Sequence, residues 1–170
     1  RRRDADLLGR VRDLRAFYTD AGVLPRAVLA SLYSPWRPSL HALSGDLWWQ
    51  VVLFVAAGAA ALALAAGYRT RTATVVSWLL LVSLHNRNPV VLNGGDVLLR
   101  MLLLWAAFVP LGERLSVDAR RRARPARDRV RSLATAGLLL QVVTMYSVNA
   151  ALKLSGDLWL EGSAIRYVYS

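Results

Sequence analysis

The sequence contains no cysteine, a single lysine and two histidines, His41 and His85. The absence of cysteine excludes disulfide bonds and thiolate metal sites. Two histidines without an HExxH-like spacing do not predict a metal centre. The sequence also lacks a glycine-rich phosphate loop and a GxSxG nucleophile motif. We therefore expect no metal cofactor.

Apolar residues are abundant instead. They make up 55% of the 170 residues, and the mean hydropathy is +0.34. Because they gather in blocks of about 20 residues, they predict a polytopic membrane protein. The net charge of +11 would also suit a nucleic-acid-binding protein. However, the arginines cluster beside the apolar blocks, so we expect membrane lipids, and not nucleic acid, as partners.

The apolar blocks predict an all-α, polytopic transmembrane helical bundle with about four spans. A basic amphipathic helix over residues 1–17 is expected to lie on the membrane surface or to end an upstream span. We interpret residues 1–170 as a single transmembrane domain that is part of a longer chain. The predicted spans lie near residues 47–67, 72–92, 97–111 and 132–152.

The distribution of arginine predicts the orientation of the bundle. Arg69, Arg71 and the eight arginines of the connector 112–131 flank the predicted spans on one side. The positive-inside rule makes that side cytoplasmic. The segment 85–96 and Lys153 then lie on the extracytoplasmic side of a multi-pass protein of the cell (inner) membrane.

Lys153 follows directly after the fourth apolar run, whereas 21 arginines supply the other cationic side chains. Tyr146, Asn149 and Lys153 are spaced to share one helix face. Unlike arginine, a lysine can lose its proton when desolvation disfavours the charged form. Lys153 is therefore a candidate general base. The alternative is an interfacial anchor whose ammonium reaches the headgroups.

His85, Asn86, Arg87 and Asn88 form a polar run at the end of the second predicted span. Such groups usually mark a cavity or a buried network, and a helix cap with a pairing arginine is the alternative. We expect an outward-facing, partly embedded polar pocket formed by residues 85–100 and 146–161.

Three tracts resemble known membrane proteins. The tract MYSVNAALKLSGDLWLEGSAIRY is similar to the vitamin K-dependent γ-glutamyl carboxylases, in which an aromatic-rich helix ends in a lysine. The tracts SLHNRNPVVLNGG and FYTDAGVLPR resemble bacterial relatives called horizontally transferred transmembrane domain (HTTM) proteins. The similarity covers nearly the whole chain, and the three tracts occur in matching order.

The resemblance implies an extracytoplasmic active site that uses reduced vitamin K or another quinol. In the carboxylases a lysine deprotonates the quinol, oxygen then generates a strong base, and a glutamate is carboxylated. Lys153 falls on that lysine. By analogy, the residues that would line the quinol pocket or hold the oxyanion are Asn88, Arg87, His85, Tyr146, Asn149 and Trp159.

Two hypotheses follow. The first is an enzyme, a quinol-dependent oxygenase (epoxidase) or a carboxylase of the lyase type acting on a carboxylate substrate, with Lys153 as its base. Oxygenation is the better supported activity, because Pro89 stands where the animal carboxylases have a histidine. The second is a non-enzymatic membrane scaffold or transporter-like module of the same fold.

Overall fold

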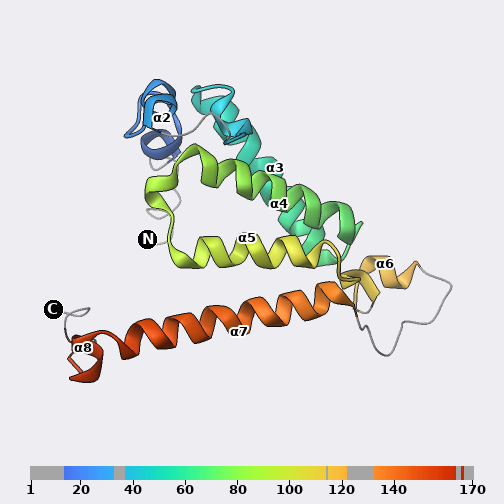
Figure 1. Cartoon of the computed structure of the whole chain (residues 1–170). Helices are drawn as coiled ribbons and strands as arrows, with labels where there is room; N and C mark the ends of the chain where they lie inside the picture. Colours follow the sequence, from blue (N-terminus) through green and yellow to red (C-terminus); the bar gives the residue numbers. More distant parts are fainter. Residues whose placement is uncertain (1–13, 33–36, 114, 122–131, 164–165, 167–170) are drawn as a thin grey trace, which may run out of the picture. The chain divides into compact units, whose positions relative to one another are not determined.

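The computed structural model describes residues 14–32, 37–113, 115–121, 132–163 and 166, and these residues form helices and turns with no strand among them (Figure 1). The prediction of an all-α fold is confirmed. The chain divides into two compact units, Arg1–Asp128 (unit 1) and Arg129–Ser170 (unit 2), each described here by itself. The grouping of both into one transmembrane domain stays a prediction.

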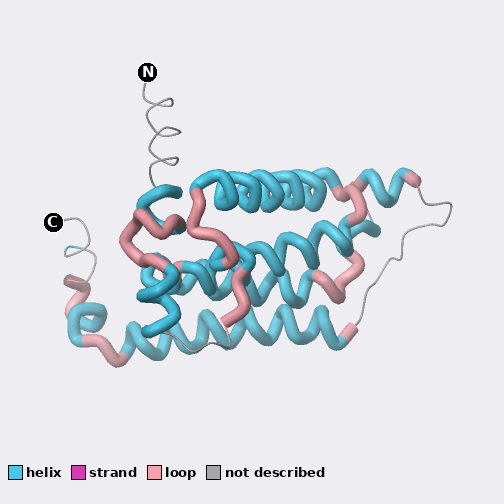
Figure 2. Tube along the Cα trace, turned by 90° about the horizontal axis from the view of Figure 1, so that it is seen from above, coloured by secondary structure: helices cyan, strands magenta, loops and turns pink. Residues whose placement is uncertain are grey.

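Three long helices organise unit 1. Helix α4 packs against both α3 and α5, and the short helix η1 also contacts α4 (Figure 2). Ahead of them lie a helical turn at residues 14–18 and a loop that leads into α2. The elements of unit 1 are α2 (Arg26–Leu32), η1 (Leu40–Ala42), α3 (Leu47–Ala66), α4 (Thr70–Arg87), η2 (Pro89–Val91), α5 (Gly94–Ala106), η3 (Leu111–Glu113) and α6 (Val117–Arg120).

The helix ends of unit 1 have local causes. Helix α3 ends at Gly67, which adopts a left-handed conformation (φ 70°). Helix α4 ends at Arg87 because Pro89 disfavours helical backbone at Asn88. Helix α5 begins with a capping box, in which the side chains of Asn93 and Asp96 each accept a hydrogen bond from the other residue's backbone N–H. The second and third predicted spans therefore begin and end earlier than residues 72–92 and 97–111.

Unit 2 is built around one helix. Helix α7 (Leu133–Leu154) starts at Ser132, whose hydroxyl accepts a hydrogen bond from the backbone N–H of Thr135. A turn at Ser155 and Gly156 leads to the short helix α8 (Asp157–Leu160). No residue of α7 is buried.

Two of the described helices, α3 and α7, are long and apolar enough to cross a membrane. With 13 residues, α5 is only about 20 Å long, short of the roughly 30 Å hydrocarbon core. Helix α4 has 18 residues but carries Arg71 and Arg87 near its ends. The structure thus supports two candidate spans, and the larger number of about four is not confirmed. Of the predicted interfacial helix, residues 1–13 lie outside the described part of the chain.

Burial in unit 1 follows a pattern that suits lipid better than water. The described buried side chains are mostly polar, including Gln50, Thr74 and Arg87, while large apolar side chains such as Leu62 remain exposed. In water, exposed apolar patches and buried charges are both unfavourable. In a membrane, apolar side chains face lipid and polar ones face the protein interior.

Candidate functional site

Arg87 lies at the centre of a buried polar network in unit 1. Its side chain is fully buried at the last residue of α4. Its Nη1 donates a hydrogen bond to the backbone carbonyl of Leu24 at 2.7 Å, and its Nη2 lies 3.6 Å from Oδ1 of Asp20. A buried arginine is tolerated only when it is paired and hydrogen-bonded, so these two contacts fix the end of α4 against the loop before α2.

Asp20 joins this loop to α2 and to the segment before α3. Its carboxylate accepts hydrogen bonds from the backbone N–H of Arg26 at 3.0 Å and from its Nε at 2.8 Å. Its own N–H donates to the carbonyl of Gly45, where a Cβ would collide with the Asp20 carboxylate. The hydrogen bond from Arg26, aided by the charges of Arg26 and Arg87, holds the pKa of Asp20 below its usual value.

Asn88 adds a third connection to the same region. Its side chain is 1% exposed, and its Nδ2 donates to the carbonyl of Phe17 at 2.8 Å. Its Oδ1 accepts a hydrogen bond from the N–H of Val90 and thereby caps the start of η2. The tracts SLHNRNPVVLNGG and FYTDAGVLPR are therefore in direct contact. Arg87 and Asn88 use their polar atoms to connect the two tracts.

A second buried network surrounds His41 in η1. The imidazole Nδ1 lies 2.8 Å from the hydroxyl of Ser83, which also accepts the backbone N–H of His41. The Nε2 of Gln50 donates to the carbonyl of His41 at 2.9 Å and to that of Ser44 at 2.8 Å. Burial, and to a smaller extent the charge of Arg87, lowers the pKa of His41 from 6.5 to about 4. The imidazole is therefore neutral at pH 7.

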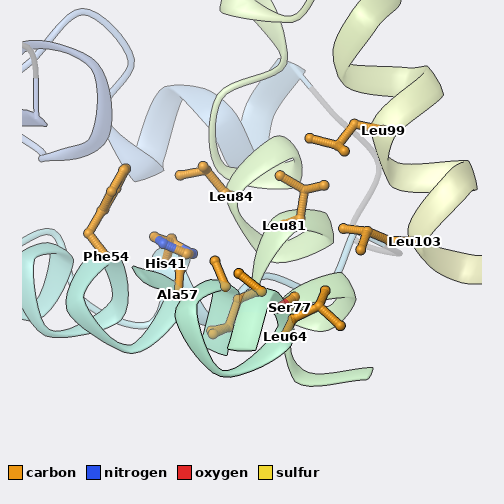
Figure 3. Close-up of a pocket in the computed structure, with 12 residues that line it drawn as sticks. His41, Phe54, Ala57, Leu64, Ser77, Leu81, Leu84, Leu99 and Leu103 are labelled. Atoms are coloured by element: carbon orange, nitrogen blue, oxygen red, sulfur yellow. The ribbon is translucent and has the colours of Figure 1, made fainter. Parts of the chain in front are cut away.

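An apolar cavity of about 520 Å³ lies beside His41, between α3, α4 and α5 (Figure 3). Polar side chains among its described lining residues come from His41 and Ser77. The Ser77 hydroxyl has no hydrogen-bond partner in the described part of the chain. The walls consist of leucines and alanines together with Phe54, whose ring packs edge-on against His41. This cavity can hold a neutral, apolar molecule with few polar groups.

His85 is buried on α4, and its Nδ1 lacks a hydrogen-bond partner among the described residues. It is not among the residues that line the cavity. The structure therefore places His85, Arg87 and Asn88, the predicted site residues of the tract SLHNRNPVVLNGG, in the protein interior. Of these three described residues, His85 (Nδ1) and Arg87 (Nε and Nη2) have buried polar atoms without a hydrogen-bond partner.

Lys153 and Trp159 lie together in unit 2. The Nζ of Lys153, which is exposed near the end of α7, is 4.5 Å from the centroid of the Trp159 ring in α8. Tyr146 is exposed on α7, and the Asn149 side chain donates to the carbonyl of Met145 one turn earlier. Since His85, Arg87 and Asn88 belong to unit 1, a common pocket with Lys153 stays a prediction.

Sequence reasoning did not identify the cavity or its neighbours His41, Gln50 and Phe54. Asp20 lies in the tract FYTDAGVLPR, but the sequence predicted no role for it. A detectable signal was the presence of two polar side chains, His41 shortly before the first apolar run and Gln50 within it. In the described residues, no group of three or more His, Cys, Asp or Glu side chains could hold a metal ion.

Comparison of the chain with family models, with curated proteins and with solved structures gives no match. The resemblance to the vitamin K-dependent carboxylases and HTTM proteins therefore remains a prediction based on the three tracts.

Proposed function

We propose that this chain is a multi-pass membrane protein of the vitamin K-dependent carboxylase-like class. It binds a quinol in the cavity between α3, α4 and α5 of unit 1. By the resemblance to the carboxylases, Lys153 of unit 2 is the proposed base of quinol oxygenation. Spans near 47–67, 72–92, 97–111 and 132–152 and an extracytoplasmic Lys153 complete the proposal. It draws support from the length and apolarity of α3 and α7 and from the polar interior of unit 1.

The cavity is the observation that carries the proposal. Its volume of about 520 Å³ falls in the range of small-molecule sites. An ionised ligand would be poorly solvated between its leucine and alanine walls. A quinol suits such a site, because it combines an apolar ring and tail with two hydroxyl groups. The neutral His41 imidazole and the unpartnered Ser77 hydroxyl are the groups that such hydroxyls would meet.

The proposed role of Lys153 is to accept the hydroxyl proton of the quinol. The proton moves to Nζ, and the lysine becomes an ammonium ion. An ammonium ion is attracted to the face of an indole ring, so Trp159 at 4.5 Å would stabilise this product of proton transfer. Oxygen is the co-reactant in the proposed oxygenation. In the second reaction that the resemblance implies, the strong base formed from the quinol would lead to carboxylation of a carboxylate substrate. The sequence supports this reaction less well than oxygenation.

A matched pair of alanine variants tests the cavity. Ala61 lines it, whereas Ala59 is an exposed residue of the same helix that does not. We expect Ala61→Phe to fill the cavity and to weaken binding of a menaquinol analogue about tenfold or more in detergent, with Ala59→Phe as the control. Equal binding by both variants would show that the quinol lies elsewhere.

The scaffold or transporter-like alternative is favoured by one observation. Lys153 is exposed and rests on Trp159, an arrangement also typical of an interfacial anchor. The exchange Lys153→Arg separates the two hypotheses, because an anchor tolerates a permanent cation and a base does not.

A further inference from the structure

A compact basic surface lies where α3 turns into α4. We call it the arginine corner and define it as Tyr68, Arg69, Arg71, Arg120 and Arg121. Tyr68 and Arg69 belong to the turn after α3, and Arg71 lies in the first turn of α4. The other two arginines come from α6 and the residue that follows it. The corner thus combines two segments that are far apart in the sequence.

Asp118 holds these two segments together. Its Oδ1 accepts a hydrogen bond from the backbone N–H of Arg69, and its Oδ2 accepts from the N–H and the hydroxyl of Thr70. Its own N–H donates to the carbonyl of Gly67 at 2.9 Å. Because the carboxylate is directed at backbone groups, it fixes the turn without forming an ion pair with the side chains of the arginine corner.

The Tyr68 ring gathers two of the guanidinium groups. The Cζ of Arg69 lies 5.8 Å from the ring centroid, and the Cζ of Arg121 lies 5.4 Å from it. Tyr68 itself is 38% exposed, and the four arginines are exposed. Both guanidinium groups therefore lie near one aromatic ring, and each guanidinium group can donate paired hydrogen bonds to the oxygens of a phosphate.

The backbone at Arg69 indicates that the side chain is needed for more than folding. Arg69 has φ 44°, a left-handed conformation that is strained for any residue with a Cβ. Glycine, found two residues earlier at φ 70°, would adopt it without strain. An arginine at this position therefore lowers the stability of the turn. We interpret the positive charge that it adds to the arginine corner as the reason for its presence.

The described residues 67–71, 112–113 and 115–121 contain four arginines and two acids, and no described acid forms an ion pair with the four arginines. This positive surface lies directly beyond the C-terminal end of α3, a candidate membrane span. We propose that the arginine corner binds the phosphate of an anionic phospholipid headgroup, with Tyr68 at the level of the membrane interface. The proposal depends on α3 crossing a membrane and not on the quinol chemistry.

The test uses the full chain in mild detergent with an equimolar mixture of phosphatidylglycerol and phosphatidylcholine. Native mass spectrometry measures the ratio of the two lipids retained by the protein. We expect the parent to retain phosphatidylglycerol preferentially and the double variant Arg69→Gln, Arg121→Gln to lower that ratio about tenfold. The control removes the same charge away from the corner and outside the predicted interfacial helix, at Arg37 and Arg166, both exposed.

Three outcomes would overturn the proposal. The parent shows no preference, the control variant loses as much preference as the corner variant, or a short RNA displaces phosphatidylglycerol and reveals a nucleic-acid site. A single variant, Arg69→Gly, covers the case in which the double variant does not fold. It relieves the backbone strain, so we expect an unchanged or higher unfolding temperature together with a lower phosphatidylglycerol ratio. An unchanged ratio in this folded variant would also contradict the proposal.

Discussion

The two units of the chain use their polar residues in opposite ways. In unit 1, polar side chains are buried and connect distant segments, as Arg87 does when it donates to the carbonyl of Leu24. In unit 2, the predicted site residues Tyr146, Asn149 and Lys153 are exposed, and Asn149 donates to the carbonyl of Met145 in its own helix. The position of a polar residue in one of the three family-like tracts is therefore a poor guide to its role.

This difference bears on the candidate site. The predicted pocket residues Arg87 and Asn88 have hydrogen-bond partners inside unit 1, so a structural role accounts for them. Lys153 has an aromatic neighbour, Trp159, and an accessible amine. We therefore interpret the buried network as structural, and the proposed chemistry depends on Lys153 in unit 2 and on the cavity beside His41 in unit 1.

The contrast between the polar residues of unit 1 and those of unit 2 is tested most strongly by the variant Arg87→Met. The variant leaves the Leu24 carbonyl without its donor and removes one charged partner of Asp20. We expect the free energy of unfolding to fall by about 3 kcal/mol, because the lost interaction is buried and charge-assisted. Unfolding by SDS in mixed micelles, followed by circular dichroism, measures it. Arg15→Met, at an exposed position, serves as the control and should change stability by less than about 0.5 kcal/mol.

The second prediction concerns acid. The folded-state pKa of His41 is about 4, against 6.5 for a free histidine. Between these values the unfolded chain binds the proton and the folded chain does not, so stability falls as the pH drops from 6.5 towards 4. The loss attributable to His41 should be about 2 kcal/mol at pH 5. Unfolding titrations at pH 7 and pH 5 measure it.

The control for this prediction is His41→Gln, which cannot titrate. We expect it to be less stable than the parent at pH 7 and to lose much less stability between pH 7 and pH 5. Asp20 also contributes to the loss of stability in acid, at a lower pH than His41. Since its folded pKa lies below the ordinary value, its stabilisation is present above that value and is lost as the pH falls through the folded pKa. An equal acid response in parent and His41→Gln would contradict the burial described here.

The smallest predicted effect lies in unit 2. Ser132→Ala removes the cap of α7, in which the serine hydroxyl accepts the N–H of Thr135. We expect a loss of about 1 kcal/mol or less, because the site is exposed and the helix has 22 residues. The matched change Ser147→Ala, within the exposed helix, should be nearly neutral. A loss as large as that of Arg87→Met would show that unit 2 is as interdependent as unit 1.

The helices whose ends coincide with the change from uncharged to charged residues in the sequence were the most predictable parts of the fold. The span expected at 47–67 corresponds to Leu47–Ala66, and the span expected at 132–152 corresponds to Leu133–Leu154. For α4, the apolar residues after Pro89 extended the predicted span to 92. The bias of Pro89 against helical backbone at Asn88 ends the helix at Arg87.

The connections within unit 1 could not be predicted from periodicity. Arg87 and Leu24 are 63 residues apart, and His41 and Ser83 are 42 residues apart. Helical spacing relates only residues within a few turns. The polarity of the run from His85 to Asn88 indicated a buried network or a cap, and both occur. The partners became apparent only in three dimensions.

The central claim is that Lys153 acts as a base towards a bound quinol. Its most direct test is oxygen-dependent epoxidation of reduced vitamin K by the purified full-length protein in detergent, with Lys153→Arg measured beside it. We predict turnover by the parent and a loss of at least about 100-fold in the variant, with binding of the quinol retained. Turnover by Lys153→Arg at the parental rate, or no turnover by a folded parent across several quinols, would contradict the claim.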